Sequence, residues 1–259
     1  MIICAAGDIH GAMDRLYEDV LAFEQSLGVR FDWVLHVGDF GVWPDPERVD
    51  RATRDHDGAG DFPRWFAEKR AAPRRTVFIK GNHEDFAWLD SQKNREILPG
   101  LIYLPNGQSI ELDTEGAPGR LRVAGLGGCY GPSGYQQKSK DLQGYAKRHY
   151  TEDEIALLPP QGAADILLLH DAPLGTDFVQ KRPNGERRYT STAVGLAEAV
   201  TRVRPRVCFF GHHHNRVDWD VGGIKCVGLN VVRRPGNLVA IEVPVKGREW
   251  QHLGEWPKA

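Results

Sequence analysis

Short apolar runs separated by polar turns recur along this chain, and a helical stripe lies between the first two runs. Met1 to Ala6 is apolar and predicts a buried strand. Met13 to Leu27 carries apolar residues at positions 13, 16, 17, 20, 23 and 27, which is the period of an amphipathic helix. Gly28 follows in the position where glycine often ends a helix. Phe31 to Val37 then predicts a second strand.

The same pattern predicts further elements up to the C-terminal region. Strands are expected over 76–79, 121–126, 165–169, 207–210, 226–229 and 238–243, and helices over 61–70, 85–93, 151–158 and 192–203. Thr151 and Glu154 have the spacing of a capping box. Residues 102–104 and 109–112 flank an Asn-Gly pair, which predicts a β-hairpin. Helices alternating with strands and hairpin-like pairs together indicate a layered α/β domain with mixed sheets.

Several segments lack a clean period. Residues 43–60 are rich in Pro, Gly and Asp and predict a surface loop, whereas 181–189 predict a basic and aromatic loop. Residues 129–150 interleave Tyr with Lys and Arg, which predicts a long loop that runs over one face of the domain. We expect a catalytic domain over 1–245, with a substrate-side loop at 130–150, and a C-terminal tail over 246–259. Trp250 and Trp256 of that tail are expected to dock on the core.

Polar side chains of a restricted kind follow five of the predicted strands. They are Asp8 and His10, then Asp39, Asn82 and His83, then His170, and finally His212 and His214. In open α/β sheets, ligands collect at the carboxyl ends of strands. If these strands are adjacent and parallel, their terminal side chains form one cluster.

This set of side chains predicts a metal centre. It offers two carboxylates, one amide oxygen and several imidazoles but no thiolate, and mixed oxygen and nitrogen ligation suits Mn, Fe, Zn or Co. Seven candidate ligands are too many for one ion, so two ions with a bridging carboxylate are expected. Paired ions roughly 3.5–4 Å apart clamp the attacking and leaving oxygens of a phosphoryl displacement.

Composition and charge limit the classes of substrate and partner that this chain can bind. The chain has 259 residues, of which 41% are hydrophobic and 26% charged, and its net charge of −2 gives no general attraction to nucleic acid. A polyanionic substrate therefore needs local positive charge or metal. The apolar runs are too short to span a bilayer, so no membrane association is expected. Four scattered cysteines without a C-x-x-C pair and the lack of a signal-peptide pattern predict a reduced, cytoplasmic setting.

The order of the blocks resembles that of the calcineurin-like metallophosphoesterase superfamily. The blocks are Asp8-x-His10, Gly38-Asp39, Gly81-Asn82-His83-Glu84, His170 and Gly211-His212-x-His214, and they cover the chain to about residue 216. The resemblance implies a four-layer α/β/β/α sandwich of two mixed β-sheets flanked by helices. It also implies two divalent metal ions, with Mn foremost and Fe, Zn, Ni or Co as alternatives.

The resemblance implies a role for each matching position. Asp8, His10 and His214 correspond to ligands of the first metal, and Asn82, His170 and His212 to ligands of the second. Asp39 is similar to the carboxylate that bridges both metals. His83 matches the histidine that assists the leaving group, while a hydroxide bridging the metals attacks phosphorus.

Within the superfamily, the chain looks most like the RNA lariat-debranching enzymes and their prokaryotic relatives. The resemblance rests on Gly38-Asp39-Phe40, on the segments 78–84 and 121–128, on the Tyr- and Lys-rich stretch with His149, and on 168–173. Those enzymes typically carry Cys where this chain has Asp8. The protein Ser/Thr phosphatases carry an Asp-Arg-Gly after the bridging carboxylate, and this chain does not.

These observations predict a dinuclear metal-dependent phosphodiesterase acting on a nucleotide or RNA-type substrate. The alternative is a phosphomonoesterase acting on a small metabolite or phosphoprotein, and a third class is a scaffold on an inactive fold. No obligate protein partner is evident. Tyr135, Arg148 and His149 are the candidate substrate contacts, although the same stretch could be a solvated loop.

The remaining histidines are expected to lie outside the metal shells. His213 should point away from its two neighbours, since alternate residues of an extended segment face opposite sides. His36 is expected in the core or behind the ligands, and His56 and His252 on the surface.

Overall fold

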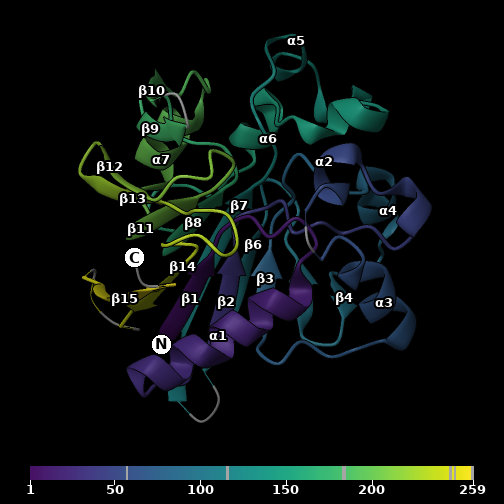
Figure 1. Cartoon of the computed structure of the whole chain (residues 1–259). Helices are drawn as coiled ribbons and strands as arrows, with labels where there is room; N and C mark the ends of the chain where they lie inside the picture. The colour runs from purple at the N-terminus through teal and green to yellow at the C-terminus, as the bar shows by residue number, and fades with distance from the viewer. Residues whose placement is uncertain (57, 115–116, 183–184, 245–246, 248, 258–259) are drawn as a thin grey trace.

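Two β-sheets with different strand orders make up the centre of the molecule in this computed structural model (Figure 1). The structure describes residues 1–56, 58–114, 117–182, 185–244, 247 and 249–257. The seven-stranded sheet has the order β15-β14-β1-β2-β3-β5-β4, and the six-stranded sheet has the order β12-β13-β11-β8-β7-β6. Both sheets contain parallel and antiparallel pairs, as the sequence predicts.

The strands of the larger sheet come from both ends of the chain. They are β1 (Ile2–Ala6), β2 (Trp33–His36), β3 (Thr76–Phe78), β4 (Glu96–Leu98), β5 (Leu101–Tyr103), β14 (Leu238–Glu242) and β15 (Gln251–Trp256). The smaller sheet contains β6 (Ser109–Thr114), β7 (Ala117–Leu126), β8 (Ile166–Leu169), β11 (Val207–Phe210), β12 (Val217–Val221) and β13 (Ile224–Gly228). A separate hairpin pairs β9 (Asp177–Arg182) with β10 (Gly185–Thr190).

The helices lie around the two sheets (Figure 1). They are α1 (Met13–Leu27), α2 (Arg51–Arg54), α3 (Asp61–Glu68), α4 (Phe86–Ser91), α5 (Pro132–Tyr135), α6 (Glu152–Ala156) and α7 (Leu196–Val203). Three 3₁₀ helices, η1 (Pro46–Arg48), η2 (Ser139–Asp141) and η3 (Gly144–Arg148), lie in the long connections. The predicted capping box at Thr151 and Glu154 is present and begins α6.

Three hydrophobic clusters separate four layers. One cluster lies between the sheets and joins β1 residues such as Ile3 to β8 and β11 residues such as Leu168 and Phe209. A second lies between the larger sheet and α1 with α3. The third lies between the smaller sheet and α6 with α7. This arrangement confirms the predicted α/β/β/α sandwich of two mixed sheets flanked by helices.

The predicted hairpin over 102–112 is wrong, because its two arms belong to different sheets. β5 pairs with β3 and β4 of the larger sheet, whereas β6 pairs with β7 of the smaller one. The side chain of Asn106 accepts a hydrogen bond from the Gly127 amide at 2.6 Å and donates one to the Gly127 carbonyl at 3.1 Å. These contacts fix the Asn-Gly turn as a crossing between the two sheets.

Two other segments contain more secondary structure than the sequence predicts. Residues 43–60 are not simply a surface loop, because they contain η1 and α2 and bury Trp43 and Val49. Residues 181–189 fall largely in β9 and β10, although the side chains of 181–184 lie outside the described part. The exposure of β10 explains why it lacks an apolar alternation.

The C-terminal segment contributes a strand to the larger sheet. β15 pairs with β14, and Trp256 packs on Phe23 of α1 with ring centroids 5.9 Å apart. Trp250 packs against the cluster between the sheets. The predicted docking of both tryptophans is therefore confirmed, and the domain division at residue 245 stays a prediction.

Candidate metal centre

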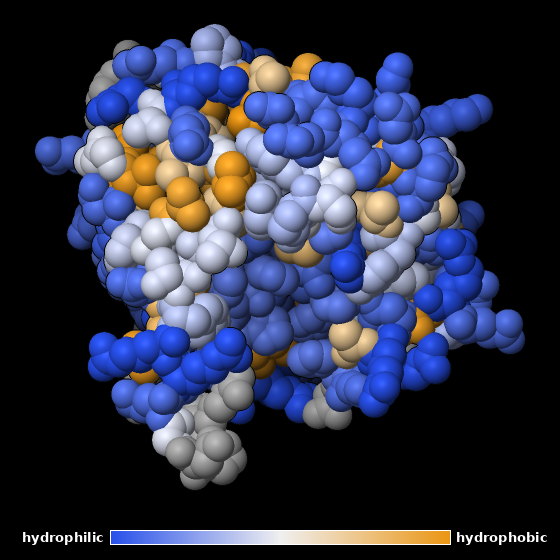
Figure 2. Space-filling model, turned by 90° about the horizontal axis from the view of Figure 1, so that it is seen from above, coloured by the Kyte–Doolittle hydropathy of each residue, from blue (hydrophilic) through white to orange (hydrophobic). Residues whose placement is uncertain are grey.

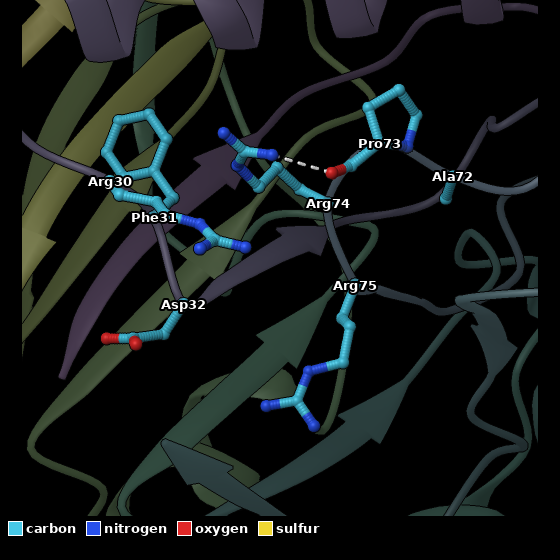
Figure 3. Close-up of a pocket in the computed structure, with 7 residues that line it drawn as sticks. All are labelled: Arg30, Phe31, Asp32, Ala72, Pro73, Arg74 and Arg75. Carbon is cyan, nitrogen blue, oxygen red and sulfur yellow. Dashed lines mark hydrogen bonds between the residues drawn. The ribbon is translucent and has the colours of Figure 1, made fainter. Parts of the chain in front are cut away.

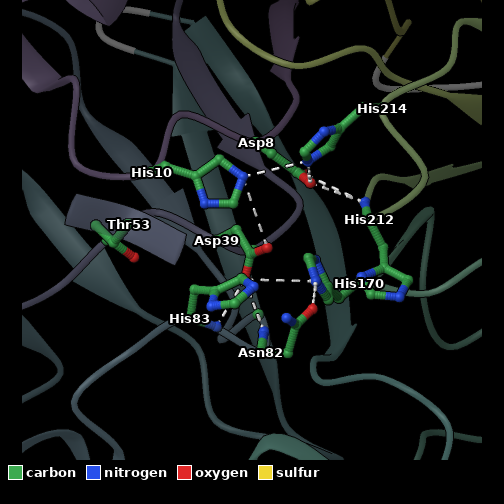
Figure 4. A network of polar contacts seen from close by, with 12 residues as sticks. Asp8, His10, Asp39, Thr53, Asn82, His83, His170, His212 and His214 are labelled. Atoms are coloured by element: carbon green, nitrogen blue, oxygen red, sulfur yellow. Dashed lines mark hydrogen bonds and ion pairs between the residues drawn. The ribbon is translucent and has the colours of Figure 1, made fainter. Parts of the chain in front are cut away.

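The carboxyl ends of parallel strands from both sheets deliver the candidate ligands to one place (Figure 4). Asp8 and His10 follow β1, Asp39 follows β2, Asn82 follows β3, His170 follows β8, and His212 with His214 follow β11. Backbone hydrogen bonds join these loops, for example His10 N to Asp39 O at 2.9 Å and Gly211 N to His170 O at 3.0 Å. The predicted convergence of strand ends is therefore present.

One group of ligand atoms comprises Asp8, His10 and His214, all within 4.8 Å of one another. His214 Nε2 lies 3.0 Å from Asp8 Oδ2 and 3.2 Å from His10 Nε2. Asp8 is fully buried and also accepts hydrogen bonds from the His212 amide. These are the three residues that the sequence assigns to the first metal.

A second group comprises Asp39, His170 and His212, again with ligand atoms within 4.8 Å of one another. His170 Nε2 lies 3.5 Å from Asp39 Oδ1 and 2.9 Å from Asn82 Oδ1. The other carboxylate oxygen of Asp39 lies 4.0 Å from His10 Nε2 of the first group. Asp39 therefore stands between the groups with one oxygen toward each.

The contacts of His170 show that this site fits a cation. His170 Nδ1 lies 2.8 Å from the Val37 carbonyl oxygen, which can only accept, so Nδ1 donates a hydrogen bond to it. His170 Nε2 faces Asn82 Oδ1 and Asp39 Oδ1. An imidazole nitrogen, an amide oxygen and a carboxylate oxygen that meet at one place are ligand types that suit a metal ion. The hydrogen bond to Val37 is also the outer contact that orients metal-binding histidines.

Burial keeps two of the imidazoles in the form that binds metal. It lowers the pKa of His10 to about 4 and that of His212 to about 4, so both rings are neutral at pH 7. Burial acts to raise the pKa of Asp8, but the hydrogen bond and charge of His214 outweigh it and lower that pKa. The pKa of Asp39 is also lowered, because the charges of His170 and His10 outweigh the effect of its burial.

The backbone at the ligands adopts unusual conformations. His10, Asp39, His212 and His214 have φ angles of 46°, 52°, 64° and 50°. Left-handed conformations cost non-glycine residues of order 1–3 kcal/mol each and tend to occur at functional sites. Close packing is also visible at Gly81 and Gly211, where an added Cβ would lie 2.0 Å from Asp39 Oδ1 and 2.2 Å from Asp8 Oδ1.

Glu84 holds the loop that carries Asp39, a role that the sequence did not reveal. Its buried carboxylate accepts hydrogen bonds from the amides of Phe40, Gly41 and Val42 at 2.7–3.0 Å. The Gly81 amide donates a fourth at 3.3 Å. Burial and the charge of Asp39 raise the pKa of Glu84 to about 8, and the amide donors act against that rise.

His83 lies beside the cluster and is held by Asp50, which the sequence analysis did not identify. Asp50 Oδ2 lies 2.6 Å from His83 Nδ1, while Asp50 Oδ1 accepts the Thr53 amide at 2.7 Å as the N-cap of α2. Asp50 therefore orients the His83 ring and leaves Nε2 available. The only sequence signal was the Asp-x-x-Thr spacing of an N-cap, which does not point to a residue 33 positions away.

His56 is not the plain surface residue that the sequence predicts. Its ring stacks on His10 with centroids 4.1 Å apart and planes 13° apart. His36 is buried as expected, and its Nδ1 accepts the Gly38 amide at 3.2 Å. His252 is exposed, as predicted.

His213 belongs to neither of the first two groups, although its ligand atom lies within 4.8 Å of that of His212. His213 Nε2 lies 3.0 Å from Asp171 Oδ1, and its ring stacks on Phe178 at 4.2 Å. Asp171, His212 and His213 form a third cluster of possible ligand atoms. Asp171 also accepts hydrogen bonds from the amides of Tyr130 and Ala172.

The three predicted substrate contacts have different surroundings. Tyr135 packs against Tyr130 and Tyr150 at the edge of the third hydrophobic cluster. Arg148 Nε donates to His149 Nε2 at 3.1 Å, and His149 Nδ1 lies 3.1 Å from the Cys129 carbonyl oxygen. Their contact with substrate stays a prediction.

One residue of the same segment does border the site. Tyr145 lines a cavity together with His83, a contact that the sequence analysis did not predict. Figure 2 looks onto this end of the molecule, where hydrophilic residues cover the middle of the face and apolar ones gather to one side.

The cavity in Figure 3 lies at the opposite ends of the strands. Its volume is about 310 Å³, and its lining residues, 30–32 and 72–75, directly precede β2 and β3. Arg74 pairs with Glu24 at 2.7 Å and Arg75 with Asp113 at 2.8 Å, so these charges are already balanced. The cluster at the carboxyl ends is therefore the stronger candidate for the functional site.

Comparisons with known proteins agree on one family. A family model described as calcineurin-like phosphoesterase matches residues 1–216. The lariat debranching enzyme of Caenorhabditis briggsae is 25% identical over 295 residues, which cover 98% of this chain and 53% of that protein. The lariat debranching enzyme of Schizosaccharomyces pombe is 25% identical over 280 residues, covering 96% of this chain and 57% of that protein. This chain thus spans about half the length of these relatives.

A solved structure of an archaeal phosphodiesterase matches 97% of this chain and 98% of its own, with a TM-score of 0.37 and 12% identity. Each helix in the described part of the chain is too short or too polar to cross a membrane.

Proposed function

The chain belongs to the calcineurin-like phosphoesterase family, and from that membership we propose that it is a metal-dependent phosphodiesterase acting on a nucleotide or RNA-type substrate. The chain's own residues hold the cations, orient the substrate and supply a proton.

The placement of Asp39 is the observation that carries this proposal. One of its oxygens lies 3.5 Å from His170 Nε2 and the other lies 4.0 Å from His10 Nε2. The Asn82 and His83 amides hold the first oxygen with hydrogen bonds of 2.7 and 2.9 Å. A single carboxylate fixed between two ligand groups is the arrangement that a dinuclear centre requires.

The ligand chemistry suits hard or borderline divalent cations. We propose Asp8, His10 and His214 as ligands of one ion, Asn82, His170 and His212 as ligands of the other, and Asp39 as the shared ligand. When bound, such cations would lower the pKa of water and offset negative charge on the phosphate. Carboxylate, amide and imidazole ligands favour Mn, with Fe, Zn, Ni or Co as alternatives. Four free cysteines suit a cytoplasmic setting.

His83 is the residue that we propose as the proton donor to the leaving oxygen. Its Nδ1 is bound by Asp50, so Nε2 is free to carry and deliver a proton. Protonation of a leaving group by a positioned imidazole typically contributes 10²–10⁴-fold. Asp50 does not touch the reacting atoms in this scheme and acts as a positioning residue.

The similarity to proteins named lariat debranching enzymes supports a nucleic-acid-like diester over a phosphoprotein. The direct test compares hydrolysis of bis-(p-nitrophenyl) phosphate, p-nitrophenyl phosphate, and 2′,5′- and 3′,5′-linked dinucleotides by purified protein with Mn²⁺. We expect the diesters to be cleaved faster than the monoester, and we expect a chelator to abolish all cleavage.

Two variants assign the activity to this site. Asp39→Asn should remove nearly all turnover, and His83→Ala should lower kcat by about 10²–10⁴-fold on substrates with poor leaving groups. The matched controls Asp45→Asn and His252→Ala alter exposed residues and should match the wild type. Faster cleavage of the monoester would favour the phosphomonoesterase alternative, and wild-type turnover by Asp39→Asn would exclude this centre.

A further inference from the structure

A cavity of about 440 Å³ opens beside His83. Its lining residues are Asp50, Arg51, Ala52, Asp55, His83 and Tyr145, so both α2 and η3 contribute to it. Its volume falls in the range of small-molecule sites. A group bound here would lie next to the residue that protonates the leaving oxygen.

Tyr145 presents an unusually exposed aromatic ring to this cavity. The residue is 56% exposed, and the guanidinium carbon of Arg148 lies 4.1 Å from its ring centroid. Arg148 is held in turn by His149. The guanidinium covers one face of the ring as a cation–π partner, so an aromatic ligand can stack on the other.

The segment that carries Tyr145 is held rigidly against the His83 loop. Lys80, two residues before Asn82, donates from its buried ammonium to the carbonyls of Lys147 at 2.8 Å and His149 at 3.3 Å. Lys147 also forms an ion pair with Asp90 of α4. A ring fixed in this way loses little entropy when a ligand binds, which favours specific recognition.

The polar groups of the cavity suit a ring that carries both hydrogen-bond donors and acceptors. Asp50 is engaged by His83, but the Asp55 carboxylate and the Arg51 guanidinium have no hydrogen bond or ion pair with any other described residue. One carboxylate and one guanidinium are therefore left to contact an occupant. A nucleobase carries both N–H donors for Asp55 and ring acceptors for Arg51, in addition to a flat face for Tyr145.

We propose that this cavity binds the base of the departing nucleoside, stacked on Tyr145 and hydrogen-bonded to Asp55 and Arg51. The inference rests on the proposed phosphodiesterase function and adds a substrate class to it. The preferred substrates are diesters in which the group that leaves toward His83 is itself a nucleoside.

The test uses pairs of diesters that differ only in the base of the departing nucleoside. Diadenosine monophosphates in 2′,5′ and 3′,5′ linkage are compared with counterparts whose departing ribose is abasic. Because stacking of one base on an aromatic side chain contributes about 1–3 kcal/mol, we expect kcat/KM to be roughly 10- to 100-fold higher with the base present. Tyr145→Ala should reduce this ratio to near one, and Tyr145→Phe should preserve it.

A control and a second readout separate this inference from the catalytic proposal. Phe66→Ala changes another exposed aromatic residue, 37% exposed on α3, and should leave the ratio unchanged. Calorimetry with chelator-treated protein should show that the abasic analogue binds more weakly than the diester that carries the base. Tyr145→Ala should weaken binding of the complete diester by the same factor. Cleavage of both diesters with a ratio near one, or an unchanged ratio in Tyr145→Ala, would overturn the base site. If no diester is cleaved, the catalytic proposal fails, and calorimetry alone decides the base site.

Discussion

Individual side chains at the strand ends make up the candidate metal centre. Residue types at these ends were enough to predict which side chains come together, because an Asp or His directly after an apolar strand has few structural uses. Asp50, His56 and Glu84 escaped prediction because their roles depend on partners elsewhere in the chain. His56, for example, belongs to a polar segment and reaches His10 only through the fold.

Replacing Asp8 by Cys tests the cation preference. A thiolate is a softer ligand than a carboxylate, so Asp8→Cys should shift the bound metal from Mn toward Zn. Metal content after growth in mixed metals, measured by mass spectrometry, reports the shift. Cys4→Ser, at a buried position in β1, controls for the thiol content of the protein. Unchanged metal content and rate would show that this position does not set the preference.

Glu84→Gln tests whether the buried carboxylate stabilises the Asp39 loop. Glutamine has an NH₂ group in place of one carboxylate oxygen, and this group cannot accept hydrogen bonds from the backbone amides that now bind that oxygen. Each backbone N–H left without an acceptor costs about 1–3 kcal/mol. We expect a lower free energy of unfolding in urea at pH 9, where the carboxyl group is ionised. The exposed Glu242→Gln should unfold like the wild type. Equal stability of the two variants would contradict the role.

At the scale of elements, the sequence predicts which strands and helices exist better than it predicts which strands pair. The strand over 121–126 and the helix over 13–27 have strong periods and are present as β7 and α1. The hairpin prediction at the Asn-Gly turn near residue 106 failed because a turn sequence does not indicate which sheet the next strand joins. β15 was not predicted because its composition is polar and the strand is stabilised by long-range contacts with β14 and α1.

Asp14 links α1 to α3 and makes that contact dependent on pH. It accepts a hydrogen bond from Trp65 Nε1 at 2.7 Å and pairs with Arg64 and Arg70. Burial acts to raise the pKa of Asp14, but the Trp65 hydrogen bond and the two arginines outweigh it and lower the pKa. A carboxyl group whose pKa falls on folding stabilises the protein above its unfolded pKa of about 3.9 and loses that effect as the pH falls through its folded value.

Asp14→Asn should therefore cost more stability at pH 7 than at pH 3.5. Urea unfolding at both values measures the difference, and Glu18→Gln on the exposed side of α1 is the control. A loss of the same size at both pH values would mean that the contact does not depend on the charge of Asp14.

The whole molecule combines two sheets around one centre, and metal should stabilise that arrangement. The layer order followed from the family resemblance, whereas the strand order within each sheet depends on long-range pairing that a single sequence does not display. Ligands bind the folded chain and not the unfolded one, so Mn²⁺ at 100 times its Kd should add about 2.7 kcal/mol. The melting temperature should then rise by about 5–10 °C.

Thermal unfolding with Mn²⁺ and with chelator measures this effect. Asp39→Asn should largely remove the rise, since it alters the ligand shared by both groups. A rise of equal size in Asp39→Asn would place the stabilising metal elsewhere in the molecule.

The distance along the chain between ligands also has a consequence for biosynthesis. His10 and His214 lie 3.2 Å apart in space but are separated by 204 positions. Closing so long a loop costs conformational entropy, so this contact forms slowly and after the intervening elements have paired. A ribosome must therefore complete β11 and the histidines after it before the first ion can be retained. The strands β12 to β15 follow these histidines in the chain, so the larger sheet is completed by β14 and β15 only afterwards.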